Sequence, residues 1–136
     1  MIGIILVSHG NLAKSFIETA ELLFGDQKNI ASLAVDREDD FQMMFDKLTL
    51  WVDKADEGQG VIILTDMFGG SASNIALSFM DGRNVEVIAG MNLPMLVRII
   101  ERREKDDLQT LALSAYDAGR KYIQRAADLL QVKIAS

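Results

Sequence analysis

Residues 1–10 read MIGIILVSHG, a continuous apolar run that ends in a serine, a histidine and a glycine. Such a run is typical of a strand that is buried on both faces of a parallel sheet, because a half-buried strand would alternate. The next apolar residues follow at helical spacing: Leu12, Phe16, Ala20 and Leu23. The segment therefore predicts a strand and then a helix, with His9, the only histidine, in the turn between them.

Three more apolar runs repeat this pattern, at Ile30–Val35, Val61–Thr65 and Val85–Ala89. Helical patterns lie between and after them, at residues 12–23, 41–52, 71–80, 94–103 and about 108–130. Strands that alternate with helices predict an α/β fold with a doubly wound, four-stranded parallel sheet, helices on both faces and the common strand order 2-1-3-4. The end, Val132-Lys133-Ile134, is short and alternating, which indicates either an edge strand lent to a second subunit or a frayed tail.

Composition narrows the function classes. A chain of 136 residues fits a single domain, here residues 1–136, that buries roughly two thirds of its unfolded surface. The net charge of -6 argues against nucleic acid and anionic membranes as partners. There is no cysteine, which removes disulfides and thiolate chemistry and is compatible with a reducing compartment. No signal-peptide pattern and no apolar stretch of about 20 residues is present, so we expect a cytoplasmic protein without membrane insertion.

The candidate site lies at the carboxyl ends of the strands, where open α/β sheets bind ligands. In the order 2-1-3-4 the first and third strands are neighbours, which brings His9 beside Asp66. An aspartate that accepts one ring N–H fixes the tautomer, so that the other nitrogen offers its lone pair as a base or nucleophile. Asp66 could instead cap the helix that follows it.

A glycine-rich turn, Gly69-Gly70-Ser71, opens the next helix. Glycines let the backbone approach a ligand closely, and free N–H groups at such a turn attract anions, so the turn is a candidate phosphate cradle. Ser71 could donate its hydroxyl to a phosphoryl oxygen or cap the helix. Met67 and Phe68, on the same loop, either dock a protein partner or fold into the core. Asn92 with Pro94 indicates first a helix start, and secondarily a wall of the site.

Several chemistries lack their signatures in this chain. It has no phosphate-binding P-loop, no dinucleotide-binding glycine pattern and no serine-hydrolase elbow. One histidine without cysteine makes a zinc site improbable, so we expect neither a metal nor a cofactor.

Three segments, VSHG at 7–10, TDMFGGS at 65–71 and GMNLPML at 90–96, together resemble the mannose-family IIA component of the bacterial phosphoenolpyruvate-dependent sugar phosphotransferase system. The resemblance covers essentially the whole chain. It implies a cytoplasmic phosphotransferase that forms a phosphohistidine at His9, with the histidine-containing phosphocarrier protein as donor and a histidine of a IIB component as acceptor. It also implies that Asp66 hydrogen-bonds the active histidine and that Ser71 and its neighbouring backbone contact the phosphate.

The resemblance further implies a homodimer in which a C-terminal strand, here Val132–Ile134, crosses to the neighbour. Two departures stand out. Ala72 occupies a position where many relatives have proline, which leaves the turn less fixed. No fused IIB domain follows Ser136, so we expect a separate IIB component as acceptor, in sugar uptake or in regulation.

Other functions remain open at this point. The phosphocarrier subunit of a dihydroxyacetone kinase system resembles this fold and has an early histidine, but the Phe-Gly-Gly-Ser turn favours the mannose type. A receiver-like signalling domain phosphorylated on Asp66 would need an acidic pair after the first strand, where this chain has Ser8 and His9. A noncatalytic interaction module would use Met67 and Phe68 for contact.

Overall fold

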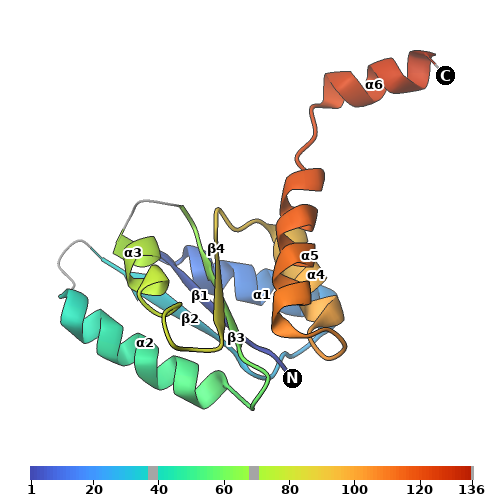
Figure 1. The fold of residues 1–136 in the computed structure, drawn as a ribbon. Helices are drawn as coiled ribbons and strands as arrows, with labels where there is room; N and C mark the ends of the chain where they lie inside the picture. The colour runs from blue at the N-terminus through green and yellow to red at the C-terminus, as the bar shows by residue number, and fades with distance from the viewer. Residues whose placement is uncertain (37–39, 68–70, 136) are drawn as a thin grey trace.

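The sheet has four parallel strands in the order β2-β1-β3-β4, as the sequence predicts (Figure 1). The structure is a computed structural model that describes residues 1–36, 40–67 and 71–135, with the side chains of 71–73 and 131–135 left undescribed. The strands are β1 (Gly3–His9), β2 (Ile30–Val35), β3 (Val61–Thr65) and β4 (Val85–Ala89). Val7 of β1 pairs with Leu33 of β2 and Thr65 of β3, so the carboxyl ends of these strands meet at one edge.

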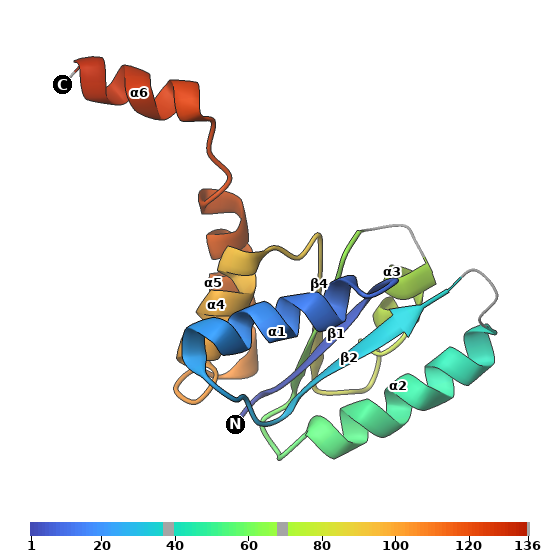
Figure 2. The same cartoon turned by 180° about the vertical axis from the view of Figure 1, so that it is seen from behind.

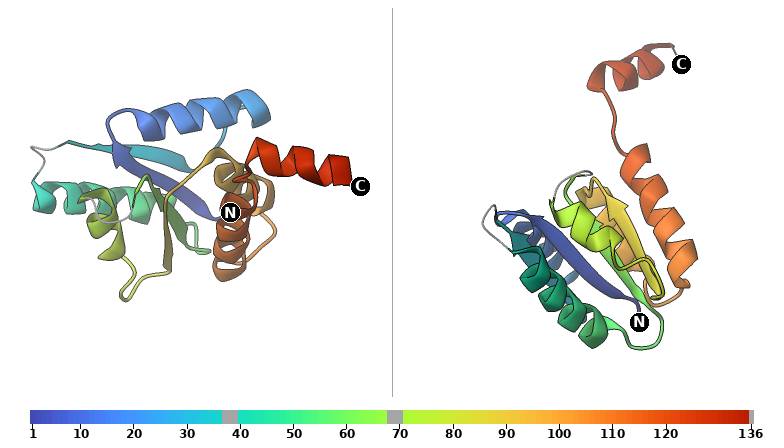
Figure 3. Two further views of the ribbon diagram at one scale, coloured as in Figure 1. Left: turned by 90° about the horizontal axis from the view of Figure 1, so that it is seen from above. Right: turned by 60° about the vertical axis from the view of Figure 1, so that its left-hand side comes forward.

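Helices cover both faces of the sheet (Figures 2 and 3). Each face has its own apolar core. On one face Ile4, Leu6 and Leu64 pack with α1 (Leu12–Phe24), α4 (Leu93–Arg102) and α5 (Leu108–Lys121). On the other, Ile5 and Ile63 pack with α2 (Phe41–Ala55) and α3 (Ser71–Leu77). Burial of each such side chain contributes about 1.5–3 kcal/mol, so the two cores hold the site edge rigid.

The edge strands differ from the expectation that all four strands are buried on both faces. β1 and β3 are buried along almost their whole length, whereas β2 and β4 contain half-buried residues. The reason is that an edge strand has only one neighbouring strand, so less of its surface is covered. Apolar runs in the sequence do not distinguish the two situations.

Side-chain caps set the start of several helices. Asn92 accepts a hydrogen bond from the Met95 N–H at 3.1 Å, with Pro94 in the first turn, which is the helix start that the sequence indicates. Asp40 and Asp107 cap α2 and α5 in the same way. Each such cap contributes about 1 kcal/mol and fixes where the preceding loop ends.

The C-terminal part corrects two expectations. The single helix expected at about 108–130 is two helices, α5 and α6 (Ala126–Ala135), and the expected strand Val132–Ile134 lies within α6. α5 loses its packing after Ala118 and Gly119, and α6 extends away from the sheet (Figure 1). A strand needs a neighbouring strand to pair with, and α6 extends away from the sheet. The segment is rich in alanine, leucine and glutamine, which favour a helix when no such partner is present.

No helix in the described ranges combines the length and the apolar character needed to cross a bilayer.

Candidate functional site

His9 is the last residue of β1 and begins the turn that leads into α1. Gly10 follows with a φ of +53°, a left-handed conformation that glycine adopts without steric cost. The chain therefore leaves the sheet sharply at His9, and the His9 side chain keeps 52% of its surface exposed. The backbone of His9 is thus held by a buried strand, whereas its imidazole is accessible to solvent.

Asp66, directly after β3, contacts His9 twice. Its Oδ2 lies 2.8 Å from the ring Nδ1 and accepts the His9 main-chain N–H at 2.9 Å. Its Oδ1 accepts the Met67 N–H at 2.9 Å. Among the described residues, the hydrogen-bond partners of this carboxylate are His9 and Met67. The structure brings together the two residues that the strand order predicts to be neighbours.

The environment of Asp66 favours its ionised form. Burial of the carboxyl, whose side chain is only 10% exposed, acts to raise its pKa. The two hydrogen bonds from His9, the charge of the protonated ring and the Met67 N–H act in the opposite direction and outweigh burial, so the pKa of Asp66 lies below its ordinary value. A carboxylate at neutral pH accepts the Nδ1–H of His9 and leaves the lone pair on Nε2.

Two buried hydroxyls at this edge were not predicted as site residues. Ser8 is fully buried; its Oγ accepts the Ala13 N–H at 2.8 Å and donates to the His9 carbonyl at 3.2 Å. Thr65 is also fully buried, and its Oγ1 is the one buried side-chain polar atom of the described residues without a hydrogen-bond partner. The signal that could have found them is a polar residue at the end of an otherwise apolar strand.

The rest of the predicted loop is only partly covered. Met67 is 57% exposed, consistent with a surface position and not with the core. Phe68, Gly69 and Gly70 lie outside the described residues. Ser71 is the first residue of α3, and its side chain is likewise undescribed. The phosphate cradle at Gly69-Gly70-Ser71 therefore remains a prediction.

The arrangement suits nucleophilic chemistry at nitrogen. A ring held at Nδ1 by a carboxylate presents Nε2 in a fixed direction, and the carboxylate stabilises positive charge that develops on the ring. Among the described residues, no cluster of three or more histidine, cysteine, aspartate or glutamate side chains could hold a metal ion.

Known proteins resemble this chain along most of its length. The family model EIIA-man, described as PTS system fructose IIA component, matches residues 3–115. The PTS system mannose-specific EIIAB component of Escherichia coli is 33% identical over 125 residues, which cover 90% of this chain and 39% of that protein. The PTS system fructose-specific EIIA component of Bacillus subtilis is 29% identical over 112 residues, which cover 82% of this chain and 77% of that protein.

The fold is shared with solved structures as well. The phosphotransferase system component EIIA from Streptococcus agalactiae superposes with a TM-score of 0.85 over 94% of this chain and 99% of that one, at 22% identity. That likeness concerns the fold alone. The match of the family model over most of the chain goes further: the protein belongs to the mannose family of IIA components of the bacterial sugar phosphotransferase system.

Proposed function

We propose that the chain is a phosphoryl carrier that accepts a phosphoryl group on His9 from the phosphohistidine of the histidine-containing phosphocarrier protein. It then passes the group to a histidine of a IIB component. The observation that carries this proposal is the 2.8 Å contact between Nδ1 of His9 and Oδ2 of Asp66. This contact supports Nε2 as the nucleophile, because it leaves that nitrogen with the free lone pair.

In this proposal, transfer of the phosphoryl group needs no covalent step at any residue other than His9. The Nε2 lone pair attacks the phosphorus of the donor, an N–P bond forms at His9, and the N–P bond of the donor breaks with its electron pair returning to the donor ring. His9 keeps its Nδ1–H throughout, and the Asp66 carboxylate balances the charge on the ring. The same steps in reverse deliver the group to the IIB histidine. Rate enhancement comes from positioning and charge stabilisation.

The alternative acceptor, Asp66 itself, has less support. Its side chain is 10% exposed, and its two oxygens accept N–H groups from His9 and Met67. An attack on phosphorus would compete with these hydrogen bonds for the carboxylate lone pairs. His9, with 52% of its side chain exposed, is the more accessible nucleophile.

The chemical stability of the phosphoprotein tests this proposal. The protein is incubated with labelled phosphoenolpyruvate, enzyme I and the phosphocarrier protein, and the label is then exposed to acid and to alkali. We expect label that survives alkali, is lost in acid, and is discharged when a IIB component is added. An acid-stable phosphoprotein, or label that a IIB component cannot discharge, would contradict the proposal.

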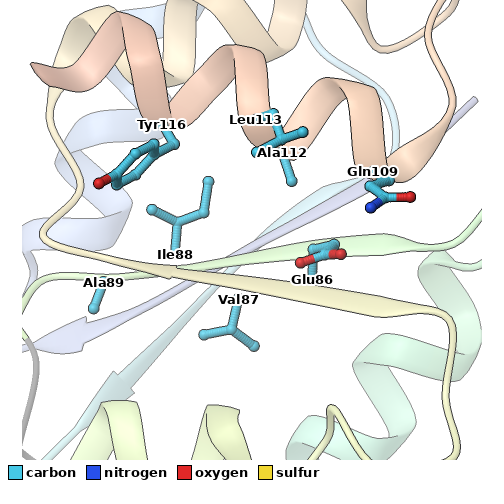
Figure 4. Close-up of a pocket in the computed structure, with 8 residues that line it drawn as sticks. All are labelled: Glu86, Val87, Ile88, Ala89, Gln109, Ala112, Leu113 and Tyr116. Atoms are coloured by element: carbon cyan, nitrogen blue, oxygen red, sulfur yellow. The ribbon is translucent and has the colours of Figure 1, made fainter.

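We also propose that the protein acts as a homodimer. β4 pairs with β3 on one side, and its other side opens, with α5, into a groove of about 400 Å³ (Figure 4). The groove is lined along the strand by Glu86, Val87, Ile88 and Ala89, and along the helix by Gln109, Ala112, Leu113 and Tyr116. A strand edge beside an apolar groove suits an added strand. In this proposal the segment Val132–Ile134 of a second copy, which lies within α6 in the single chain, changes from helix to strand when it pairs with β4.

A further inference from the structure

The hydroxyl of Ser8 interrupts a strand that is otherwise apolar. It lies in β1 after five consecutive buried residues, and it is itself fully buried. Burying a hydroxyl is unfavourable unless it forms hydrogen bonds, and Ser8 forms two. Its Oγ accepts the Ala13 N–H and donates to the carbonyl of His9. The residue therefore connects the end of the strand to the first turn of α1, across the turn that carries His9.

The hydrogen bond from the Ala13 N–H to Ser8 replaces the side-chain cap that α1 lacks. Asn11 occupies the N-cap position of α1 but makes no side-chain cap hydrogen bond. Ser8 supplies the missing acceptor at 2.8 Å, from inside the sheet. Because the sheet is rigid and α1 packs on it, this bond fixes the length and course of residues 9–12.

His9 is thus restrained on three sides. Its N–H and its ring Nδ1 bind Oδ2 of Asp66, and its carbonyl accepts from Ser8. The first two restraints come from Asp66, the residue after β3, and the third comes from β1. If the third is removed, the peptide between His9 and Gly10 can rotate, because Gly10 has no side chain to oppose the change. The turn that carries the Cα of His9 is then less restrained, so the imidazole can shift relative to Asp66.

We propose that Ser8 is a positioning residue for the nucleophile, whose hydroxyl holds His9 in the orientation that Asp66 needs in order to fix the ring tautomer. The kinetic part of this inference rests on the proposed function; the tautomer part does not. A displacement of about 1 Å in a reacting group can lower a rate about 100-fold, so loss of one restraint is measurable.

The test compares Ser8→Ala with Thr65→Val. Both variants delete a fully buried hydroxyl at the same edge of the sheet, but the Thr65 hydroxyl has no hydrogen-bond partner within the described part of the chain. We expect Ser8→Ala to lower the rate constant of phosphorylation at saturating phosphocarrier protein by about 10- to 100-fold. The KM for the phosphocarrier protein should not change, and Thr65→Val should react like the wild type. Ser8→Thr keeps the hydroxyl and should restore the rate.

Nitrogen NMR of the His9 ring gives a second readout that needs no phosphoryl transfer. The wild type should show one tautomer, with the proton on Nδ1, and Ser8→Ala should show a mixture. If Ser8→Ala does not fold, Ser8→Cys, of similar size and with weak hydrogen bonding, takes its place. The inference would be overturned if Ser8→Ala reacted at the wild-type rate and showed a single tautomer. It would also be overturned if Thr65→Val lost as much of the rate as Ser8→Ala. Failure of the wild type to accept a phosphoryl group would instead contradict the proposed function.

Discussion

Within the described residues, the Asp66 carboxylate accepts three N–H groups, two from His9 and one from Met67. In Asp66→Asn the amide keeps an oxygen for a main-chain donor, but its NH₂ group can donate to Nδ1 and stabilise the tautomer with the proton on Nε2. That tautomer has no lone pair at the attacking nitrogen. We expect the rate of phosphorylation to fall at least about 100-fold while His9 remains present. Single-turnover transfer from the phosphocarrier protein measures the rate, and a rate within about threefold of the wild type would contradict this role.

Asp66 also makes stability depend on pH. Its pKa is lower in the folded state than in the unfolded state, so folding is stabilised at pH values above the ordinary aspartate pKa of about 4. The stabilisation is lost as the pH falls through the lower, folded-state pKa. Asp106 and Asp107 shift in the same direction, the first through its hydrogen bond with Arg102 and the second through the Thr110 N–H. The contribution of Asp66 is therefore the difference between wild type and Asp66→Asn.

Urea unfolding of both proteins at several pH values between neutrality and pH 3 measures that difference. The stability advantage of the wild type over Asp66→Asn should shrink as the pH falls through the acid range. A difference that stays constant down to the lowest pH would show that the pKa of Asp66 is not lowered by folding.

Thr65, unlike Asp66, has a buried polar group without a hydrogen-bond partner among the described residues, its hydroxyl. An unsatisfied buried polar group costs about 1–3 kcal/mol, and valine has nearly the same shape. We expect Thr65→Val to raise the free energy of unfolding by about 1 kcal/mol, measured by denaturant titration. A loss of stability would indicate that the hydroxyl is hydrogen-bonded in solution.

At the scale of elements, the four strands and the helices over the sheet could be predicted because their patterns are local. A continuous apolar run predicts a buried strand, and apolar residues three and four apart predict a helix that covers it. The break between α5 and α6 could not be predicted, because no proline or glycine lies between Lys121 and Ala126. It depends on where the packing of α5 ends, which is a tertiary property. The conformation of Val132–Ile134 likewise depends on what the segment can pair with.

Close packing between elements gives a matched pair of glycine substitutions. A Cβ at Gly3 of β1 would lie 2.6 Å from the carbonyl oxygen of Ala55, at the end of α2, and backbone cannot easily yield. A Cβ at Gly119 of α5 would meet the flexible end of Met95 at 2.7 Å. We expect Gly3→Ala to lower the free energy of unfolding by about 1–3 kcal/mol. Gly119→Ala should stay within about 1 kcal/mol of the wild type, because helix propensity offsets the contact. Equal effects in thermal unfolding would contradict this account of the β1–α2 contact.

At the scale of the whole molecule, the part of the site that the strand order of the sheet positions could be predicted from the sequence. The strand order places His9 and Asp66 next to each other, and both follow directly from apolar runs. The hydrogen bonds of Ser8 could not be predicted, because they depend on the exact course of the turn to Ala13. Of the predicted cradle Gly69-Gly70-Ser71, the two glycines and the Ser71 side chain lie outside what the structure describes, so its part in the site remains a prediction.

The proposed dimer makes a prediction at the same scale. A chain that ends at Gln124 lacks α6 and should be a monomer by sedimentation equilibrium, whereas the full chain should be a dimer at the same concentration. Leu113→Glu places a charge in the groove of Figure 4, at a side chain that is 59% exposed, and should weaken the dimer without unfolding the subunit. A truncated chain that still dimerises would exclude the C-terminal segment as the occupant of the groove.

The most direct test of the central claim is intact-mass spectrometry of the wild type and His9→Ala after incubation with phosphoenolpyruvate, enzyme I and the phosphocarrier protein. The account predicts that the wild type gains one phosphoryl group and that His9→Ala gains none, with its circular dichroism spectrum unchanged. A phosphoryl group that His9→Ala still acquires, on Asp66 or elsewhere, would contradict it.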